Sequence, residues 1–329
     1  MNKKDTSYTD YLKPLDHNMN LSDQITALIK QQFKVKPQVV KFIFSPKKAY
    51  YISIGKFNIQ VNPERHPDVR KVMAKGKAGC FLCPENMPKE ERGIMLDKDW
   101  SLYPNPSPYE KNHCVLVYNK FEEHPHQIIN RHIYVEKALE LIWQLCYKEA
   151  RQNFNLTFNS VGAAASSAHF HFQLFECDLP ITNHLVNLTN KENLKIGRVV
   201  GYDAIVLVID GEYTDKNELI SEIFLVLDTL NMAFIPYNLL IKVINNRIRV
   251  FLYPRSREYP DVCGSDLCDI RFGICEMSGM AIVYANQIAT NIKAEDFAKA
   301  LHSTTIAQGK LPAALDSAYL EYTKVKVGK

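Results

Sequence analysis

The stretch Asn159–Gln173, NSVGAAASSAHFHFQ, places two histidines and a glutamine at alternate positions behind a run of small residues. Successive side chains of a β-strand point to opposite faces, so His169, His171 and Gln173 are predicted to share one face. The other face is wholly apolar and consists of Phe170, Phe172 and Leu174. An apolar face opposite two imidazoles and an amide favours a functional site over an ordinary surface strand. The stretch therefore predicts a core strand whose polar face cradles a phosphate-sized group.

The composition is that of a folded protein with a substantial core. The chain has 329 residues, 46% of them hydrophobic and 23% charged, and a formal net charge of +4. That charge suits small anionic substrates, and no concentrated basic face points to nucleic acid. The longest apolar runs, such as 204–209, are too short to span a membrane. Eight irregularly spaced cysteines and the absence of an apolar leader predict a cytoplasmic protein.

Two similar series of elements follow one another along the chain. Within 111–175 we expect a buried strand, a helix at 131–152 and a strand pair that ends in the central stretch. After residue 200 the order is again strand, helix and two strands, with an Asn-Asn-Arg turn between the last two. The pattern predicts an α+β fold in which two similar halves share an antiparallel sheet, and only the first half carries the histidines. The expected division is 1–56, 57–190 and 200–329.

The ends of the chain add a helix and strands to this plan. Residues 20–35 are predicted to form a helix with Ser22 as its N-cap. Segments 39–45 and 50–62 are strand-like, and EMSGMAIVY at 276–284 predicts one more strand, followed by a helix that begins near Ala294.

Polar and thiol groups gather after the second of those strand-like segments. Asn62 and Arg65 stand where its end could meet an anion, although an ordinary polar loop explains them equally well. Cys80-x-x-Cys83 has the spacing that lets two thiolates bind one metal ion. The pair alone leaves a structural zinc, a redox dithiol and two incidental cysteines open.

A strand-borne imidazole behind a glycine-containing turn suits attack on phosphorus. A neutral histidine can take a phosphoryl group and so split one transfer into two easier steps. The amides and hydroxyls of Gly162–Ser167, Ser166 and Ser167 included, are candidates to hold the phosphoryl oxygens. Gln173 can donate a hydrogen bond but cannot shuttle a proton, which favours transfer between substrates over hydrolysis.

These residues resemble a known family. HFHFQ at 169–173 resembles the histidine-triad (HIT-like) superfamily, in its nucleotidylyltransferase and phosphorylase branch. NPSPYEKNHCVLVY at 105–118 is similar to that branch's N-x-S-P-x-x-x-x-H segment. QVNPER at 60–65 resembles the Q-x-N-x-x-R segment of the GDP-hexose phosphorylases, and EMSGMAIV their E-x-S-G strand. The nearest resemblance is to GDP-L-galactose and GDP-D-glucose phosphorylases, over residues 57–305.

The resemblance implies a role for each matching residue. His171 would be the nucleophile that forms a covalent nucleotidyl-histidine, and Gln173 would steady it. Asn159 and Ser166 match positions that support the phosphate or the histidines, and Asn62 and Arg65 match nucleotide contacts. The implied substrates are a nucleotide sugar and either phosphate or a sugar 1-phosphate. A dinucleoside polyphosphate phosphorylase or hydrolase, or a catalytically idle nucleotide sensor, are the alternatives.

The cysteine pair departs from the GDP-hexose phosphorylases and resembles galactose-1-phosphate uridylyltransferase. That resemblance implies a structural zinc bound by four residues, here Cys80, Cys83, His124 and His169. His126 competes with His124, because the local match shifts easily by two residues. His169 would then orient the site while His171 reacts. The mixture of features leaves the base, the sugar and the acceptor open, and the resemblance also allows a homodimer.

Overall fold

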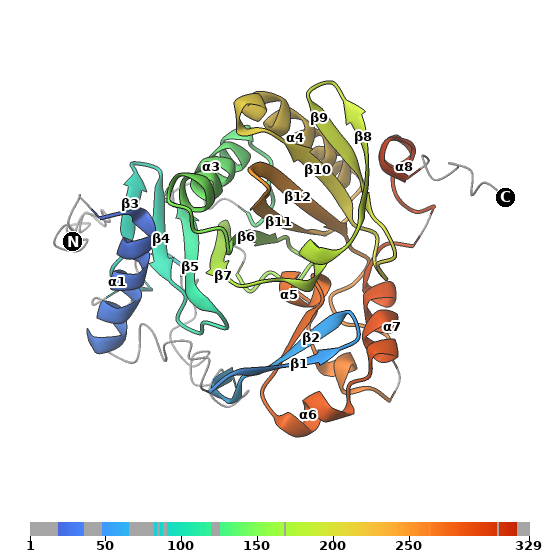
Figure 1. The fold of residues 1–329 in the computed structure, drawn as a ribbon, viewed down its shortest axis with the longest axis horizontal. Helices are drawn as coiled ribbons and strands as arrows, with labels where there is room; N and C mark the ends of the chain where they lie inside the picture. Colours follow the sequence, from blue (N-terminus) through green and yellow to red (C-terminus); the bar gives the residue numbers. More distant parts are fainter. Residues whose placement is uncertain are drawn as a thin grey trace, which may run out of the picture.

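The computed structural model describes residues 19–35, 48–65, 82–83, 86–87, 91–119, 126–167, 169–262, 264–307 and 309–320. A ten-stranded antiparallel sheet runs through the middle of the molecule, in the order β3-β4-β5-β7-β6-β11-β12-β10-β9-β8 (Figure 1). The strands are β3 (Ile94–Asp97), β4 (Trp100–Pro104), β5 (Lys111–Tyr118), β6 (Phe154–Asn159), β7 (His171–Glu176), β8 (Val186–Lys191), β9 (Leu194–Val199), β10 (Leu207–Gly211), β11 (Tyr237–Ile244) and β12 (Arg247–Pro254).

The sheet contains two copies of one unit. Strand β5, helix α3 (His132–Trp143), β6 and β7 form the first copy, and β10, α4 (Lys216–Met232), β11 and β12 form the second. Their orders in the sheet, β5-β7-β6 and β11-β12-β10, mirror each other about the β6–β11 pair. There Asn159 lies opposite Asn238. The prediction of two similar halves that share one antiparallel sheet is therefore confirmed; the domain boundaries themselves stay a prediction.

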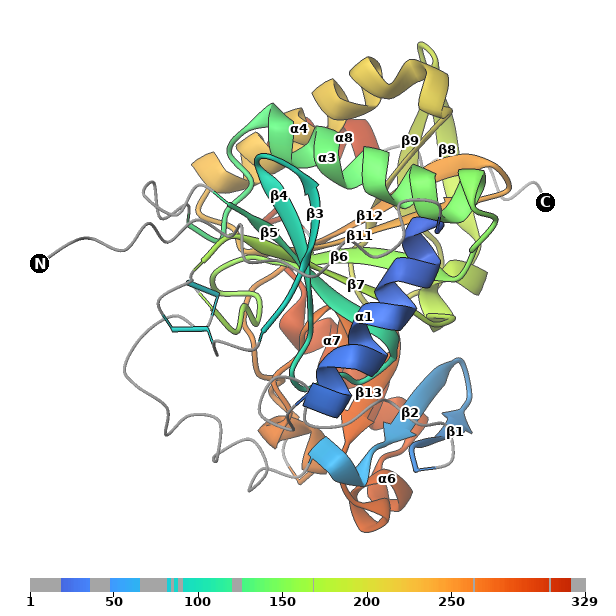
Figure 2. The same cartoon turned by 90° about the vertical axis from the view of Figure 1, so that its left-hand side faces the viewer.

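Different layers cover the two faces of this sheet (Figures 1 and 2). Helices α1 (Leu21–Val35), α3, α4 and α8 (Ala313–Leu320) pack on one face and share its core with the predicted apolar side chains of β7. The other face meets a small sheet and three helices. They are β1 (Tyr50–Ile54), β2 (Phe57–Val61), β13 (Met280–Val283), α5 (Ile274–Met277), α6 (Asn286–Asn291) and α7 (Ala294–Thr304).

Three local predictions were wrong. Ser22 is not the N-cap, because α1 begins at Leu21 and the N–H groups of both residues donate to the Glu149 carboxylate at 3.0 and 2.9 Å. Residues 50–62 hold two strands, not one, because Gly55 turns the chain at a φ of 61°. The last strand starts later than predicted, because the Glu276 side chain accepts the Gly273 N–H and closes one helical turn before β13. Segment 39–45 lies outside the described residues.

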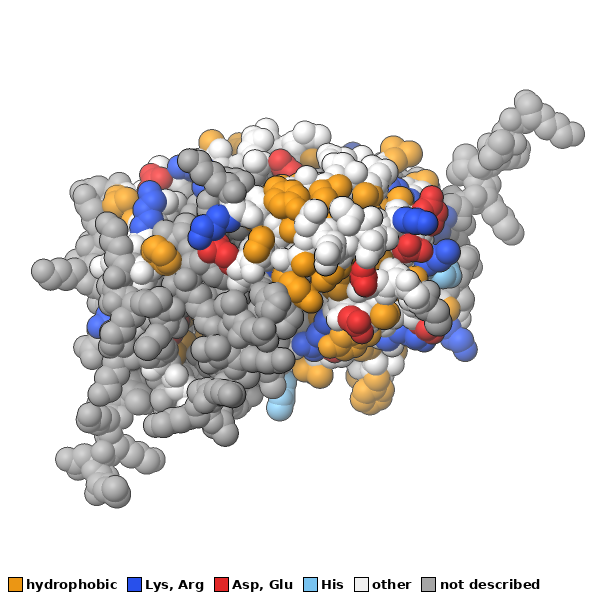
Figure 3. Space-filling view, turned by 90° about the horizontal axis from the view of Figure 1, so that it is seen from below, with side chains coloured by type: hydrophobic (Ala, Val, Ile, Leu, Met, Phe, Trp, Pro, Cys, Tyr) orange, Lys and Arg blue, Asp and Glu red, His pale blue; other side chains and the backbone are white. Residues whose placement is uncertain are grey.

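The surface carries charges of both signs. On the face seen from below, basic and acidic side chains are interspersed around a group of hydrophobic ones (Figure 3). In the part of the chain that the structure describes, no helix is both long and apolar enough to cross a membrane.

Candidate active site

Strand β7 presents the predicted polar residues to the face that the small sheet covers. His171 and Gln173 share that face with Phe175, which belongs to the core on the small-sheet side. Across the ladder, His171 lies opposite Val117 of β5, and Gln173 lies between Val115 of β5 and Thr157 of β6. The side chains opposite His171 and Gln173 are therefore apolar or small. The imidazole and the amide are the groups on this part of the face that can take part in chemistry or hydrogen bonding.

Hydrogen bonds fix the tautomer of His171. Its Nδ1 lies 2.8 Å from the carbonyl oxygen of His169, and because a carbonyl can only accept, Nδ1 must carry the proton. Burial lowers the pKa of His171, so the imidazole is neutral. A neutral ring with its proton on Nδ1 leaves the lone pair on Nε2. The ring is thus prepared as a nucleophile.

Gln127 holds the backbone of the same residue. The His171 N–H donates to Gln127 Oε1 at 2.8 Å, and Gln127 Nε2 donates to the His171 carbonyl at 2.8 Å. The same amide donates to the Asn159 carbonyl at 3.1 Å and so ties β6 to β7. Sequence analysis did not identify Gln127, since an isolated glutamine before a helix carries no motif of its own.

His169 lies beside one of the predicted zinc ligands. Its Nδ1 is 3.5 Å from Cys83 Sγ. In a tetrahedral zinc site, with bonds of about 2.3 Å to sulfur and about 2.1 Å to nitrogen, these two atoms would be roughly 3.6 Å apart. His126 forms an isolated β-bridge with His169, and Ser167 Oγ accepts the His169 N–H at 3.1 Å. The pair of donors therefore fits one zinc ion.

The other two residues of the predicted set, Cys80 and His124, lie outside the described residues. Among those described, no three metal-ligating side chains gather at one point. Whether His124 or His126 belongs to the set thus stays a prediction, as does the zinc itself.

Gln173 is oriented by Tyr109, which precedes β5, and by His113, which lies near the start of β5. Tyr109 donates its hydroxyl to Gln173 Oε1 at 2.9 Å, and His113 Nε2 lies 3.2 Å from the same oxygen. The Tyr109 N–H points to His113 Nδ1 at 3.3 Å, which makes this nitrogen the acceptor. Burial lowers the pKa of His113 to about 3, and the nearby Arg65 charge adds to the effect. With its oxygen held in this way, Gln173 retains Nε2 as the group that can donate to a ligand.

A cavity of about 520 Å³ opens in front of this amide. Of the predicted phosphate- and nucleotide-binding residues, three line it together with Gln173: Arg65, Asn159 and Ser166. Tyr109, Tyr259 and Tyr284 add aromatic surface, and its volume is in the range of small-molecule sites. Residues distant in the sequence therefore meet here, as the resemblance implied.

The two residues of the Q-x-N-x-x-R segment behave differently. Arg65 stacks over the Tyr109 ring, with 5.3 Å from Cζ to the centroid, and donates to the Ser107 carbonyl. Asn62 is 1% exposed, and neither polar atom of its amide has a hydrogen-bond partner among the described residues. Leaving such a group unpaired costs about 1–3 kcal/mol. Asn62 does not line the cavity, so its part in nucleotide binding stays a prediction.

A buried polar network positions Asn159. Its Oδ1 accepts from Asn238 Nδ2 at 2.7 Å and from the Ile274 N–H at 3.1 Å. Asn238 also donates to the Ala163 carbonyl at 2.7 Å and accepts from the Arg255 guanidinium. Arg255 is 1% exposed, and burial lowers its pKa to about 9. Sequence analysis predicted two strands in this part of the chain but assigned no role to Asn238 or Arg255.

The loop before His169 has fewer available amides than the sequence suggested. The N–H groups of Ala163 and Ala164 donate to the Ser160 carbonyl and to Glu258 Oε1, at 3.0 and 2.9 Å. Gly162 has a φ of 81°, and a Cβ there would approach Pro236 Cγ to 2.7 Å. Ser166 is exposed and lines the cavity, whereas Ser167 supports His169. Of the two predicted serines, only Ser166 therefore faces the cavity, and phosphate binding by the loop stays a prediction.

Two protein-family models match successive parts of the sequence. Residues 23–176 match a family described as a domain of unknown function, DUF4922, and residues 180–311 match the GDPGP1-like C-terminal domain. Arabidopsis thaliana GDP-L-galactose phosphorylase 2 is 28% identical over 190 residues, which cover 54% of this chain and 42% of that protein. The match thus spans less than half of the relative's length.

Solved structures show the same fold. Yeast Ap4A phosphorylase Apa2 in complex with Ap4A superposes with a TM-score of 0.63 at 14% identity, covering 87% of this chain and 97% of that one. The complex of the same enzyme with AMP gives 0.62 at 14% identity, over 88% and 98%. The HIT-like fold class predicted from the sequence is confirmed.

Proposed function

We propose that the chain belongs to the nucleotidylyltransferase and phosphorylase branch of the histidine-triad superfamily, near the GDP-hexose phosphorylases, and that it transfers a nucleotidyl group from a nucleotide sugar to phosphate. His171 carries the group between the two substrates. The observation that supports this most directly is the neutral imidazole with Nδ1–H bound to the His169 carbonyl.

The reaction takes two displacements. In the first, the lone pair on His171 Nε2 attacks the α-phosphorus, a P–N bond forms, and the bond to the β-phosphate oxygen breaks to release a hexose 1-phosphate. In the second, an oxygen of inorganic phosphate attacks the same phosphorus and releases the nucleoside diphosphate, which returns the electron pair to Nε2. The imidazolium charge of the intermediate is stabilised by the His169 carbonyl that accepts from Nδ1.

The cavity residues and Asn62 take complementary parts in this scheme. Gln173 Nε2 donates to a phosphoryl oxygen, and Arg65 balances the negative charge that develops there. The unpaired Asn62 amide, which can both donate and accept, suits an edge of the base or the ribose.

A structural zinc completes the proposal. Cys83 and His169 would hold it with Cys80 and either His124 or His126, and it would fix the position of the His169 backbone that orients His171. Metal analysis of the purified protein should find one zinc per chain, and Cys83→Ser should lower that content. Full occupancy in the variant would remove Cys83 from the ligand set.

The test is intact-mass measurement after incubation with GDP-, UDP- and ADP-sugars, quenched without acid because a phosphoramidate is acid-labile. We expect a gain of one nucleoside monophosphate that disappears on adding phosphate and is absent in His171→Ala. His302→Ala, which removes an exposed histidine on α7, is the matched control. An adduct from Ap4A alone would reassign the donor to dinucleoside polyphosphates. Binding of nucleotide without any adduct would favour the idle sensor.

A further inference from the structure

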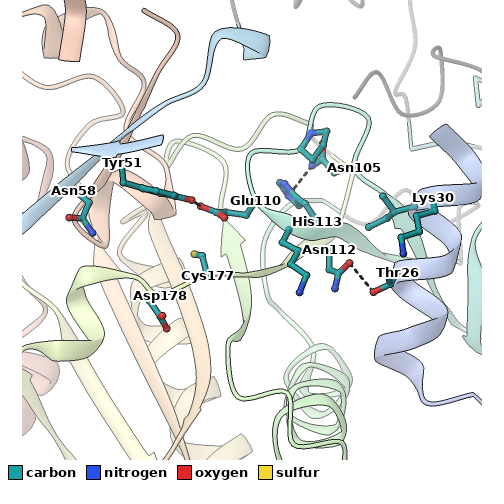
Figure 4. Close-up of a pocket in the computed structure, with 13 residues that line it drawn as sticks. Thr26, Lys30, Tyr51, Asn58, Asn105, Glu110, Asn112, His113, Cys177 and Asp178 are labelled. Carbon is teal, nitrogen blue, oxygen red and sulfur yellow. Dashed lines mark hydrogen bonds between the residues drawn. The ribbon is translucent and has the colours of Figure 1, made fainter. Parts of the chain in front are cut away.

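A second cavity, of about 770 Å³, lies next to the first (Figure 4). It is bounded by α1 on one side, by the β1–β2 hairpin on another, and by the segment that leads into β5. Its labelled polar residues approach from all three: Thr26 and Lys30 from α1, Tyr51 and Asn58 from the hairpin, and Glu110 beside β5. His171 and the residues that hold it, Gln127 and His169, do not line this cavity.

A shared wall separates the two cavities. Asn105 lines both of them, and its Nδ2 lies 3.0 Å from Nε2 of His113, which lines the second cavity. The same His113 nitrogen is 3.2 Å from Gln173 Oε1 in the first cavity. The second cavity therefore begins one side chain away from the amide that is proposed to hold the transferred phosphoryl group.

The lining carries charges of both signs, so it does not select an anion. Glu110 and Asp178 contribute two carboxylates, and Lys30 and Lys111 contribute two ammonium groups, of which that of Lys111 pairs with Glu176. Glu110 is 3% exposed, and none of the described cations forms an ion pair with it. Its Oε1 accepts from the Tyr51 hydroxyl at 2.5 Å and from Gln60 Nε2 at 2.8 Å. An uncharged hydroxyl could donate to the second Glu110 oxygen.

The rest of the lining suits the same kind of group. Asn58, Asn112 and Thr26 offer both donors and acceptors, which is what a set of hydroxyls requires. Tyr51 is 44% exposed, and Ile29 and Pro108 also line the cavity, so apolar surface is available for the carbon–hydrogen face of a ring. Figure 4 shows these polar groups converging from opposite sides of the space.

We propose that the second cavity binds the hexosyl group of the nucleotide sugar, and that Glu110 accepts a hydrogen bond from one of its hydroxyls. The inference rests on the proposed function, because the hexosyl phosphate is the leaving group of the first displacement. The nucleotide then occupies the first cavity, and the sugar lies in the second, beyond the wall formed by Asn105 and His113. Glu110 becomes a specificity-determining residue at an unspecified position of the N-x-S-P-x-x-x-x-H segment, to which sequence analysis assigned no role.

The experiment compares two donors with the same base. One is the nucleotide sugar that labels His171, and the other is the matching nucleoside triphosphate, which has no sugar on its leaving group. The second-order rate of adduct formation is measured for the wild type, Glu110→Gln and Lys30→Ala. Lys195→Ala, an exposed lysine on β9, serves as the matched control.

We expect Glu110→Gln to slow labelling by the nucleotide sugar by about tenfold or more, the worth of one hydrogen bond to a carboxylate. Labelling by the triphosphate should change by less than about twofold. Lys30→Ala should show the same selectivity with a smaller loss, and the control should match the wild type. Equal losses with both donors, or no loss with either, would overturn the assignment of the cavity. Absence of an adduct from every donor in the wild type refutes the proposed function instead.

Discussion

Replacing Glu110 by glutamine should stabilise the unliganded protein at neutral and alkaline pH. Burial raises the pKa of Glu110 from its ordinary value of 4.5 to about 7, although hydrogen bonds from Tyr51, Gln60 and the Lys111 N–H oppose this rise. The folded protein therefore binds this proton more tightly than the unfolded chain does. Glutamine has almost the same shape, keeps an oxygen that can accept from Tyr51 and Gln60, and carries no charge to bury.

The direction and magnitude of this change in the free energy of unfolding follow from proton linkage. Below pH 4.5 the carboxyl is protonated in both states and costs nothing. As the pH rises from 4.5 to 7, only the unfolded chain ionises, so the free energy of unfolding of the wild type falls. Because the pKa of Glu110 rises from 4.5 to about 7 on folding, and each pH unit is worth 1.36 kcal/mol, ionisation lowers the free energy of unfolding of the wild type by about 3 kcal/mol in total. The difference between the two proteins should thus grow from near zero at pH 4.5 to about 3 kcal/mol at pH 8.

Urea denaturation of both proteins at several pH values between 4.5 and 8.5 measures this difference. Other titrating groups, such as His113, are common to both chains and cancel. A difference that does not change with pH would show that Glu110 is ionised normally and would refute the reasoning. Saturation with a nucleotide sugar that donates to the carboxylate should reduce the difference, since the ligand then stabilises the ionised form.

Three further predictions concern single contacts. Glu149→Ala should lower the free energy of unfolding by about 1–2 kcal/mol in urea denaturation, because the first amides of α1 lose their acceptor; an unchanged value would mean that water replaces it. Asn238→Ala should slow nucleotidyl-His171 formation by about tenfold or more, because Asn159 loses its hydrogen-bond donor. The far-UV circular dichroism spectrum should not change, and labelling at the wild-type rate would contradict the prediction. Because burial lowers the pKa of His113 to about 3, its contribution to the free energy of unfolding should fall by roughly 1.4 kcal/mol per pH unit from pH 6.5 down to pH 3. The free energy of unfolding of the wild type minus that of His113→Gln should therefore fall with pH in this window, and a difference that does not change with pH would exclude the titration of His113.

Local periodicity was sufficient to predict the architecture. The alternation at 169–174 separated a polar from an apolar face, and the structure buries Phe170, Phe172 and Leu174 completely. Within the helix predicted at 131–152, apolar residues at helical spacing, Val135, Leu139 and Ile142, are buried as well. The Asn245–Asn246 turn joins β11 and β12 with φ angles of 51° and 60°, the left-handed values that asparagine tolerates. Each of these features depends on residues that are close in the sequence.

The features that sequence analysis missed depend on residues far apart in it. Glu149 caps a helix that begins 128 positions earlier, and no local pattern marks a carboxylate for that task. Asn238 supports Asn159 across 79 positions, through strands that pair only because the two halves share one sheet. The second cavity exists because α1 and the β1–β2 hairpin stand apart at the start of β5. Such placements follow from the topology, which periodicity predicts only in outline.

The two copies of the unit differ in the strand face that carries the histidines in the first half. In the second half, the face of β12 that corresponds to the histidine face of β7 carries Phe251 and Tyr253, which are buried in the core beside the small sheet. Arg249 on the same face pairs with the buried Asp210. Strands β11 and β12 are joined by two residues, whereas β6 and β7 are joined by the loop 160–170. The turn Asn245–Asn246 brings no hydroxyl and no neighbouring histidine to the strand end, so the second copy lacks the counterpart of the loop that leads into β7. Lengthening that loop alone would not create activity, because Phe251 and Arg249 would still occupy the face.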